Sequence, residues 1–468
     1  IPPTVSRHQA RSAMKKCAMW SAVTVSLLLL ALGAPQVRAD VKLSKVIDSH
    51  MVLQRDRPLP IWGSADPGEE VTVRLDDAAA AAKADAQGDW KVVLPAAKAD
   101  GKAHRLSVSG KNKIELEDIL IGDVWLGSGQ SNMEMGLSMC DKAKEEIAAA
   151  NCPTIRLLLI PKTKTETPAK DVQAQWVACS PETIAKGGWG GFSAALYYFG
   201  RKLNKDLNVP VGLIESAWGG SPIEPWTIAG GKGGGMYNGM IAPVKPLAIR
   251  GAIWYQGEAN VGNGMKYYDK MKALIEGWRG QWGYDFPFYF AQLAPWAIYT
   301  PGALPPLWEA QTASLKIPNT GMAITTDIVH NIKDIHPRNK IDVGNRLALW
   351  ALAKEYGKKD LVYSGPLYKS MQIEGNKIRV SFAHVGGGLA SRDGKPLGEF
   401  QIAGADGKFV PAQATIDGPT VVVEAAGVAA PTQVQFGWHN MANPNLMNKE
   451  GLPASPFQTD HWQGGTGE

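Results

Sequence analysis

The hydrophobic and polar positions of this chain change character twice. From Val41 to about Glu117, short β-prone runs alternate with turn residues such as Asp66-Pro-Gly68. An Ala-rich stretch, Ala78–Ala86, lies between these runs and is too short to form a dependable helix. The pattern predicts a small β-sandwich over residues 40–118, with strands at Pro60–Trp62, Val71–Leu75, Trp90–Leu94 and Arg105–Val108.

From Ile119 onward, strand-like and helix-like stretches alternate. Short unbroken apolar runs are typical of parallel strands that are buried on both faces. Between them, apolar residues recur at helical spacing in 192–203, 268–278 and 347–352. This alternation predicts a doubly wound α/β domain over residues 119–357, whose ligand crevice lies at the carboxyl ends of the strands. The predicted strands after the first are Ile155–Ile160, Val209–Ile214, Ala252–Tyr255, Phe286–Leu293 and Met322–Thr325.

After Lys359 the pattern returns to short strands separated by turns such as Asp393-Gly394. These strands predict a second all-β module over residues 358–468. The sequence leaves open whether this module stands alone or completes the N-terminal sandwich. The predicted strands are Lys377–Phe382, Glu399–Ile402, Thr420–Glu424 and Gln433–Trp438.

The first 39 residues have the layout of a secretory signal peptide with some upstream residues. Lys15 and Lys16 precede an apolar run from Cys17 to Leu32, and small residues end the segment near Ala39. The run is short for a membrane span, although an uncleaved membrane anchor is the alternative. We therefore expect an exported protein, periplasmic or extracellular, with no membrane association after cleavage.

Composition and charge narrow the function classes. The chain has 468 residues, of which 45% are hydrophobic and 20% charged, which excludes a disordered or fibrous protein. The formal net charge of +5 comes from five basic residues within residues 1–39, where there is no acid. The remaining chain is neutral, so it has no electrostatic reason to bind nucleic acid or anionic lipid.

Cysteine and histidine usage disfavours a metal site or a cofactor. Beyond residue 39 the cysteines are Cys140, Cys152 and Cys179, in a spacing that matches no zinc pattern. In an oxidising compartment these three cannot all pair; Cys140 and Cys152 are closest in sequence, and Cys179 can replace either. The eight histidines include no HExxH motif.

Ser131 is the candidate nucleophile. It lies in Gly127-Ser-Gly-Gln-Ser-Asn-Met133, directly after the first predicted strand of the α/β domain. A strand-to-helix turn would place its hydroxyl at the crevice, and the glycines permit the tight backbone of such a turn. The segment is not the G-x-S-x-G elbow of α/β-hydrolases, because Asn132 and Met133 replace the second glycine. Glycine-flanked serines also occur in ordinary turns. A catalytic role for Ser131 therefore requires a second residue that can act as a general base.

His336 is the best-placed base, because it follows the last predicted strand and precedes a helix. His330 in the same loop is the reserve. Pro337 favours an extended backbone at His336, and residues two apart in an extended segment face the same side. Asp334 is therefore predicted to lie beside His336 and to orient its ring.

Two further segments end strands at the same rim, Glu215-Ser-Ala-Trp-Gly-Gly220 and Trp254-Tyr-Gln-Gly-Glu-Ala-Asn260. Acyl transfer builds negative charge on a carbonyl oxygen, and each preorganised donor lost there costs about 3–4 kcal/mol. We expect an oxyanion hole from the backbone N–H of Ser131, that of Gly219 or Gly220, and the side-chain amide of Gln256.

Aromatic and polar side chains near the predicted crevice are candidates for binding a sugar. Indole rings stack well on sugar rings, although most of the 16 tryptophans are expected in the cores. Trp226 is the platform that we single out, and Glu258 and Asn260 are further candidates for substrate contact. The other tryptophans near the crevice are Trp218, Trp254 and Trp296.

Four ordered motifs together resemble the sialate O-acetylesterase family, a branch of the SGNH hydrolases. They are Gly129-Gln-Ser-Asn-Met133, Gly219-Gly220 before Ile223-Glu-Pro-Trp226, Trp254-Tyr-Gln-Gly-Glu258 and Asp334-Ile-His-Pro337. The resemblance extends from Met51-Val-Leu-Gln-Arg55 to Leu452-Pro-Ala-Ser-Pro-Phe457. It implies a metal-independent serine esterase that removes acetyl groups from sugars, with a flavodoxin-like α/β core and flanking β-sandwich modules.

The resemblance also implies roles for single residues. Ser131 becomes the nucleophile, His336 the general base and acid, and a glycine at 219 or 220 an oxyanion donor. Gln256 stands where the wider superfamily has an Asn. Many SGNH enzymes hold Asp three residues before the His, where this chain has Lys333. Asp334 is the first choice for the acid, and Asp327 is the alternative.

Two functions of other classes remain as alternatives. One is a non-catalytic carbohydrate-binding protein. The other is a glycoside hydrolase that uses a carboxylate pair from Glu215, Glu224 and Glu258, which leaves the Ser131 and His336 motifs unexplained. Among esterase substrates, acetylated sialic acid, xylan or pectin fragments and cell-wall sugars stay open, as does the oligomeric state.

Overall fold

The computed structural model describes residues 40–467, which belong to one compact unit. The predicted signal peptide at residues 1–39 lies outside the described residues. Within the described part of the chain, no helix is long and apolar enough to cross a membrane.

The N-terminal strands form antiparallel pairs whose buried residues alternate with exposed ones. In β4, Val71, Val73 and Leu75 face the core. The Ala-rich stretch that lacked a clear prediction is a strand, β5 at Ala78–Lys83, because a tight turn at Asp76, with φ 47°, folds it back onto β4. The strands are β1 (Lys42–Leu43), β2 (Val52–Gln54), β3 (Leu59–Ser64), β4 (Glu70–Leu75), β5, β6 (Asp89–Leu94) and β7 (His104–Ser109).

One long strand, β8 at Lys113–Gly129, runs across the expected boundary between residues 118 and 119. Its first part pairs antiparallel with β7, and its last part pairs parallel with β11 and β14. From Ile119 every residue of β8 is buried, whereas burial alternates before that point. The strand therefore passes from a sheet with a solvent-facing side into a sheet covered on both faces.

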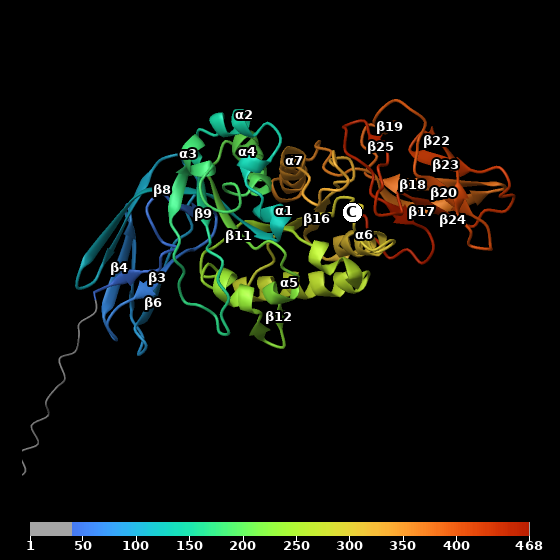
Figure 1. The fold of residues 1–468 in the computed structure, drawn as a ribbon. Helices are drawn as coiled ribbons and strands as arrows, with labels where there is room; N and C mark the ends of the chain where they lie inside the picture. The colour runs from blue at the N-terminus through green and yellow to red at the C-terminus, as the bar shows by residue number, and fades with distance from the viewer. Residues whose placement is uncertain (1–39, 468) are drawn as a thin grey trace, which may run out of the picture. The chain divides into compact units, whose positions relative to one another are not determined.

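The large mixed sheet has the order β10-β9-β11-β8-β14-β15-β16, in which β10 alone is antiparallel to its neighbour. Each strand that the apolar runs predicted is present. The helices α4 and α7 contact each other on one face, and α5 and α6 contact each other on the other (Figure 1). The strands after β8 are β9 (Cys152–Leu159), β10 (Trp176–Cys179), β11 (Val211–Ala217), β14 (Gly251–Tyr255), β15 (Phe288–Ala291) and β16 (Thr320–Ala323).

Capping residues mark one end of each of two predicted helices, α4 and α5. The Ser193 hydroxyl accepts the Leu196 N–H at the start of α4, and Gly283, with φ 77°, ends α5. The long helices are α4 (Ala194–Leu207), α5 (Lys266–Trp282), α6 (Leu304–Ala313) and α7 (Lys340–Trp350). The short elements are α1 (Ser131–Glu134), η1 (Leu137–Met139), α2 (Ala143–Ala148), α3 (Pro181–Ile184), η2 (Glu224–Trp226), β12 (Ile228–Ala229), β13 (Lys232–Gly233), η3 (Tyr237–Ile241), η4 (Glu258–Asn263), η5 (Ser314–Lys316) and η6 (Ala351–Glu355).

The C-terminal strands form sheets of their own around a separate hydrophobic cluster. Among the described residues, none of these strands pairs with an N-terminal strand, so the C-terminal module does not complete the N-terminal sheets. One sheet holds β17 (Leu367–Glu374), β18 (Lys377–Ala383), β23 (Thr420–Glu424) and β22 (Gln413–Asp417). The others hold β21 (Val410–Pro411), β20 (Phe400–Ala403), β24 (Gln433–Phe436) and β26 (Phe457–Gln458), and β19 (Leu389–Ser391) with β25 (Leu446–Asn448).

The three cysteines beyond residue 39 are free thiols in the structure. The antiparallel register of β9 and β10 sets Cys152 opposite Cys179, while Cys140 is buried elsewhere. Adjacency in the sheet thus favours a different pair from the one that is closest in sequence.

Candidate active site

Ser131 stands at a sharp turn from β8 into α1. Gly129 has φ 139°, and a Cβ atom there would lie 2.2 Å from the carbonyl oxygen of Tyr255 on β14. Glycine is therefore required for the two strands to approach at this point. The backbone N–H of Gln130 donates to the same carbonyl at 3.0 Å, which fixes the residue just before Ser131.

The structure brings Ser131 and His336 together across 205 positions of sequence: the serine Oγ lies 2.9 Å from the histidine Nε2. The edge of the Trp189 ring packs on the imidazole with a centroid separation of 4.8 Å. Burial lowers the pKa of His336, the charge of Lys340 lowers it further, and Asp334 opposes both. The imidazole is accordingly neutral at neutral pH and able to accept the hydroxyl proton.

Of the two candidate acids, the structure places Asp334 and not Asp327 beside the imidazole. Asp334 Oδ1 lies 3.8 Å from His336 Nδ1 and accepts the backbone N–H of His336 at 2.9 Å. The first distance is that of an ion pair and is too long for a hydrogen bond. Asp327 instead makes two hydrogen bonds with the Arg346 guanidinium, at 2.6 and 2.7 Å.

A cavity of about 850 Å³ opens at the Ser131 hydroxyl. It is bounded by the loops after β8, β9 and β11 and by the His336 loop, which matches the rule that ligands bind at the carboxyl ends of such strands. Its functional side chains and glycines are Ser131, Glu134, Lys162, Trp189, Glu215, Gly219, Gly220 and His336.

The predicted oxyanion donors divide into free and occupied groups. The Gly219 N–H donates to Glu134 Oε2 at 2.6 Å, and Glu134 also pairs with Lys162 at 2.6 Å. Among the described residues, the N–H groups of Ser131 and Gly220 have no hydrogen-bond partner. Both belong to residues that line the cavity, so they are the donors available to a substrate oxygen.

Gln256 is not brought to the Ser131 hydroxyl. Its side-chain amide is buried and donates to Gln130 Oε1 at 3.1 Å and to Asn260 Oδ1 at 2.7 Å, while its oxygen accepts the Tyr267 hydroxyl at 2.7 Å. These contacts leave the amide no free donor directed at the cavity. Gln256 therefore braces the turn before Ser131, in contrast to the predicted place in the oxyanion hole.

The predicted sugar contacts also lie away from the cavity. Trp226 and Trp254 are fully buried and pack edge to face, because both belong to an aromatic cluster under α5. Asn260 is buried and accepts the Ile223 N–H. The tryptophan that does line the cavity is Trp189, which was not among the predicted sugar contacts. The glycines on both sides of it in the sequence could have indicated a loop at the site. Of the other two, Trp296 donates its indole N–H to the Lys333 carbonyl, and Trp218 lies against Lys162 and Lys164.

A buried polar network holds the His336 loop against the segment after Ser131. Asn132 donates to the Glu258 carboxylate and to the Ile335 carbonyl at 3.0 Å. Lys340, at the start of α7, donates to Asn132 Oδ1 at 2.7 Å and to the Pro337 carbonyl at 2.6 Å. Burial lowers the pKa of Lys340 to about 8 and raises the pKa of Glu258. Glu258 therefore has a positioning role in place of the predicted substrate contact.

Glu215, at the carboxyl end of β11, forms part of the cavity wall. Burial raises its pKa to about 8, and the nearby Glu134 adds to the shift, although the Ser193 N–H donates to Glu215 Oε2 at 2.6 Å. The carboxyl group is thus protonated at neutral pH.

The three carboxylates predicted for a glycoside hydrolase do not come together in the cavity. Glu224 pairs with Lys270 and accepts from Asn260, Glu258 is held by Asn132, and of the three only Glu215 lines the cavity. In residues 40–467 no group of three or more His, Cys, Asp or Glu side chains could hold a metal ion. Independence of metals and cofactors stays a prediction.

Comparison with known proteins points to one family. Residues 121–353 match the sequence model of a family described as carbohydrate esterase, sialic acid-specific acetylesterase. Sialate O-acetylesterases of Pongo abelii and Homo sapiens are each 32% identical over 392 residues, covering 72% of this chain and 75% of the relative. The crystal structure of a carbohydrate acetylesterase from Xanthomonas citri superposes with a TM-score of 0.85 at 40% identity, covering 90% of this chain and 100% of that one.

Proposed function

The chain belongs to the carbohydrate esterase family of sialic acid-specific acetylesterases, and we propose that it removes O-acetyl groups from carbohydrates through an acetyl–Ser131 intermediate. Membership of this family makes it a carboxylic-ester hydrolase. The observation that carries the proposed mechanism is the 2.9 Å contact between Ser131 Oγ and His336 Nε2 at the mouth of a cavity.

In the first half of the reaction, His336 Nε2 takes the Ser131 proton while the oxygen attacks the acetyl carbonyl carbon. The tetrahedral intermediate collapses when the sugar oxygen leaves with the proton from His336. In the second half, His336 takes a proton from water, the resulting hydroxide attacks acetyl-Ser131, and acetate departs as Ser131 regains its proton. Asp334 stabilises the imidazolium of each half from its position beside Nδ1.

The backbone N–H groups of Ser131 and Gly220 are the proposed oxyanion donors, since each belongs to the cavity wall and has no partner among the described residues. Loss of one such donor typically costs about 3–4 kcal/mol of transition-state stabilisation. The Gly219 N–H becomes a third donor only when Glu134 releases it.

The substrate class follows from the relatives. Their names specify sialate and carbohydrate acetyl esters, so the proposed substrates are acetylated sugars, with acetylated sialic acid and acetylated polysaccharide fragments as the two candidates. Trp189, which packs on His336, is the aromatic side chain placed to contact the sugar ring beside the scissile ester.

The finer architecture is also a proposal. The order β11-β8-β14-β15-β16 corresponds to the strand order 2-1-3-4-5 of flavodoxin-like sheets, which supports an SGNH-type core between β-sandwich modules. We further propose export to the periplasm or the medium, with no membrane or nucleic-acid partner, from the leader-like residues 1–39 and the neutral remainder of the chain.

The test is acetate release from an O-acetylated sugar by Ser131→Ala and His336→Ala. Each variant should lose turnover by a factor of about 10³ or more, while its melting temperature stays within a few degrees of the unmodified protein. An organophosphorus ester should label the protein once, at Ser131. Retained turnover in either variant would refute the mechanism. Absence of both acetate release and an adduct in the unmodified protein would favour a carbohydrate-binding protein.

A further inference from the structure

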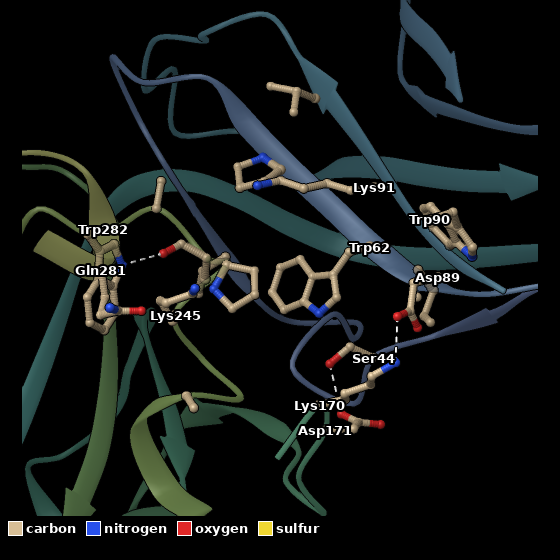
Figure 2. A pocket seen from close by; sticks show the side chains of 18 of the residues that line it. Ser44, Trp62, Asp89, Trp90, Lys91, Lys170, Asp171, Lys245, Gln281 and Trp282 are labelled. Atoms are coloured by element: carbon tan, nitrogen blue, oxygen red, sulfur yellow. Dashed lines mark hydrogen bonds and ion pairs between the residues drawn. The ribbon is translucent and has the colours of Figure 1, made fainter. Parts of the chain in front are cut away.

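A second cavity, larger than the first at about 990 Å³, lies where the N-terminal strands face the end of α5. It shares no lining residue with the cavity at Ser131. Figure 2 shows the Trp62 ring in its wall, between Lys245, Gln281 and Trp282 on one side and Asp89 and Trp90 on the other. Nothing in the esterase chemistry uses this cavity.

The wall of the second cavity contains four aromatic side chains, of which Trp62 and Trp90 are 8% and 3% exposed. Trp62, Trp90, Trp282 and Tyr284 all line it. The indole N–H groups of Trp62 and Trp90 are buried and have no hydrogen-bond acceptor among the described residues. Where such flat rings are exposed, they suit the apolar face of a sugar.

The acidic side chains in the wall of the second cavity have hydrogen-bond or ion-pair partners, whereas several basic ones lack them within residues 40–467. Every carboxylate already has partners: Asp89 pairs with Lys170 at 2.5 Å, Asp171 accepts from the Ser44 hydroxyl at 2.8 Å, and Asp85 accepts the backbone N–H of Gln87 at 2.9 Å. Figure 2 shows the first two of these contacts as dashed lines.

Three cations in the wall lack such partners, in contrast to Lys170, which pairs with Asp89. Among the described residues, Arg57, Lys91 and Lys245 have no carboxylate within ion-pair distance. The Arg57 guanidinium stacks on the Tyr284 ring at 3.7 Å, and its Nε–H is buried without an acceptor. Its terminal NH2 groups make no hydrogen bond with the described residues, and two such donors can hold a carboxylate with two hydrogen bonds.

We infer that this cavity is a second binding site, for a sugar that carries a carboxylate. The carboxylate binds Arg57, with Lys245 in the same cavity wall, and the sugar ring lies against Trp62. Satisfied acids and unsatisfied cations favour an acidic sugar over a neutral one, because a neutral ring would leave the guanidinium without a partner.

The site lies within reach of the active site. Lys162 lines the catalytic cavity and Ala169 lines the second one, so these two ends of one segment lie at most about 25 Å apart. A glycan held in the second cavity would stay at a high effective concentration near Ser131. Binding itself does not depend on the esterase reaction.

The test is isothermal titration calorimetry of the full protein with sialyllactose and with lactose, neither of which carries an O-acetyl ester. Sialyllactose should bind at one site at least about tenfold more tightly than lactose, because it adds a charge-assisted hydrogen bond. The preference should weaken at high salt. Arg57→Gln and Lys245→Gln should each remove the preference. Lys83→Gln, an exposed lysine of β5 that lines neither cavity, is the matched control and should retain it.

A fourth variant, Trp189→Ala, tells the two cavities apart, because Trp189 lines only the catalytic one. It should leave sialyllactose affinity unchanged. Equal affinity for the two sugars, no binding at millimolar concentration, or loss of binding in Trp189→Ala with retention in Arg57→Gln would each overturn the inference. Unchanged turnover of a small acetyl ester verifies that Arg57→Gln is folded. Lys245→Gln tests the preference for sialyllactose independently of Arg57.

Discussion

Replacing Glu215 by Gln should change how the stability of the protein depends on pH. In the folded protein burial raises the pKa of Glu215 from its ordinary value of 4.5 to about 8. The folded state therefore keeps a proton that the unfolded state releases, and stability falls as pH rises from about 4.5 to about 8. This change in the pKa corresponds to about 5 kcal/mol of stability. Gln has the same shape and can still accept the Ser193 N–H, but it carries no proton to lose.

Thermal unfolding at pH 5 and pH 9 measures this effect. With an unfolding entropy of about 2.1 cal/mol/K per residue, 5 kcal/mol corresponds to about 5 °C for a chain of this length. The melting temperature of Glu215→Gln relative to the unmodified protein should accordingly rise by about that amount between the two pH values. The pKa of Lys340 is also about 8, but this group is present in both proteins and cancels from the difference.

Glu182→Gln is the control, because Glu182 is solvent-exposed and pairs with Lys186 on the surface. It should show no comparable pH-dependent difference. Activity offers a second readout: ionised Glu215 in the cavity wall would oppose the oxyanion, so a fall in kcat/KM above about pH 8 should be weaker in Glu215→Gln. A constant difference in melting temperature from pH 5 to pH 9 would refute the assignment of a protonated Glu215.

Three further perturbations test the surroundings of His336 and the thiols. Asp334→Asn should lower kcat/KM by about 10²-fold or more and move its acidic limb to lower pH, since Asp334 raises the pKa of His336; Asp327→Asn should leave the limb in place, and the reverse result would make Asp327 the acid. Lys340→Met should move the acidic limb of the kcat/KM profile to higher pH, because the Lys340 charge lowers the pKa of the imidazole. An unmoved limb would show that this charge does not affect the pKa of His336. Peptide mapping after mild oxidation should find Cys152 joined to Cys179, slowly because burial raises the pKa of Cys179 to about 12; a bond from Cys140 to either would contradict the register.

Hydrophobic patterning predicted the large sheet well because its strands are buried on both faces. Such strands need unbroken apolar runs, and every run of this kind between residues 155 and 325 forms part of a strand. The exception in the N-terminal part is informative. Ala78–Lys83 has neither β-branched nor aromatic side chains, and it becomes a strand because the turn at Asp76 returns it to β4. The intrinsic propensity of these residues does not favour a strand there, and pairing with β4 determines the structure.

The sequence pattern predicted which residues lie at the same edge of the sheet. It predicted less well which hydrogen bonds and packing contacts each of them makes. Ser131 and His336 follow strands whose carboxyl ends share one edge of the sheet, so topology alone brings them close. Gln256 ends a strand at the same edge, yet its amide turns toward Gln130 and Asn260. Such a choice depends on acceptors from three separate segments, which no local period encodes. The burial of Trp226 has the same cause, since its neighbours Trp254 and Trp278 come from other elements.

The segment around Ser131 explains why separate motifs converge on one hydroxyl. Gln130, on one side of the serine, accepts the Gln256 amide, and Asn132, on the other side, is held by Lys340 and by the loop that carries the histidine. Ser131 alone of these three is directed at His336, while its neighbours bind the segments that follow β14 and β16. Removing the Asn132 amide would therefore release the histidine loop without touching the nucleophile. The polar residues beside a catalytic serine can thus fix its geometry without taking part in the chemistry.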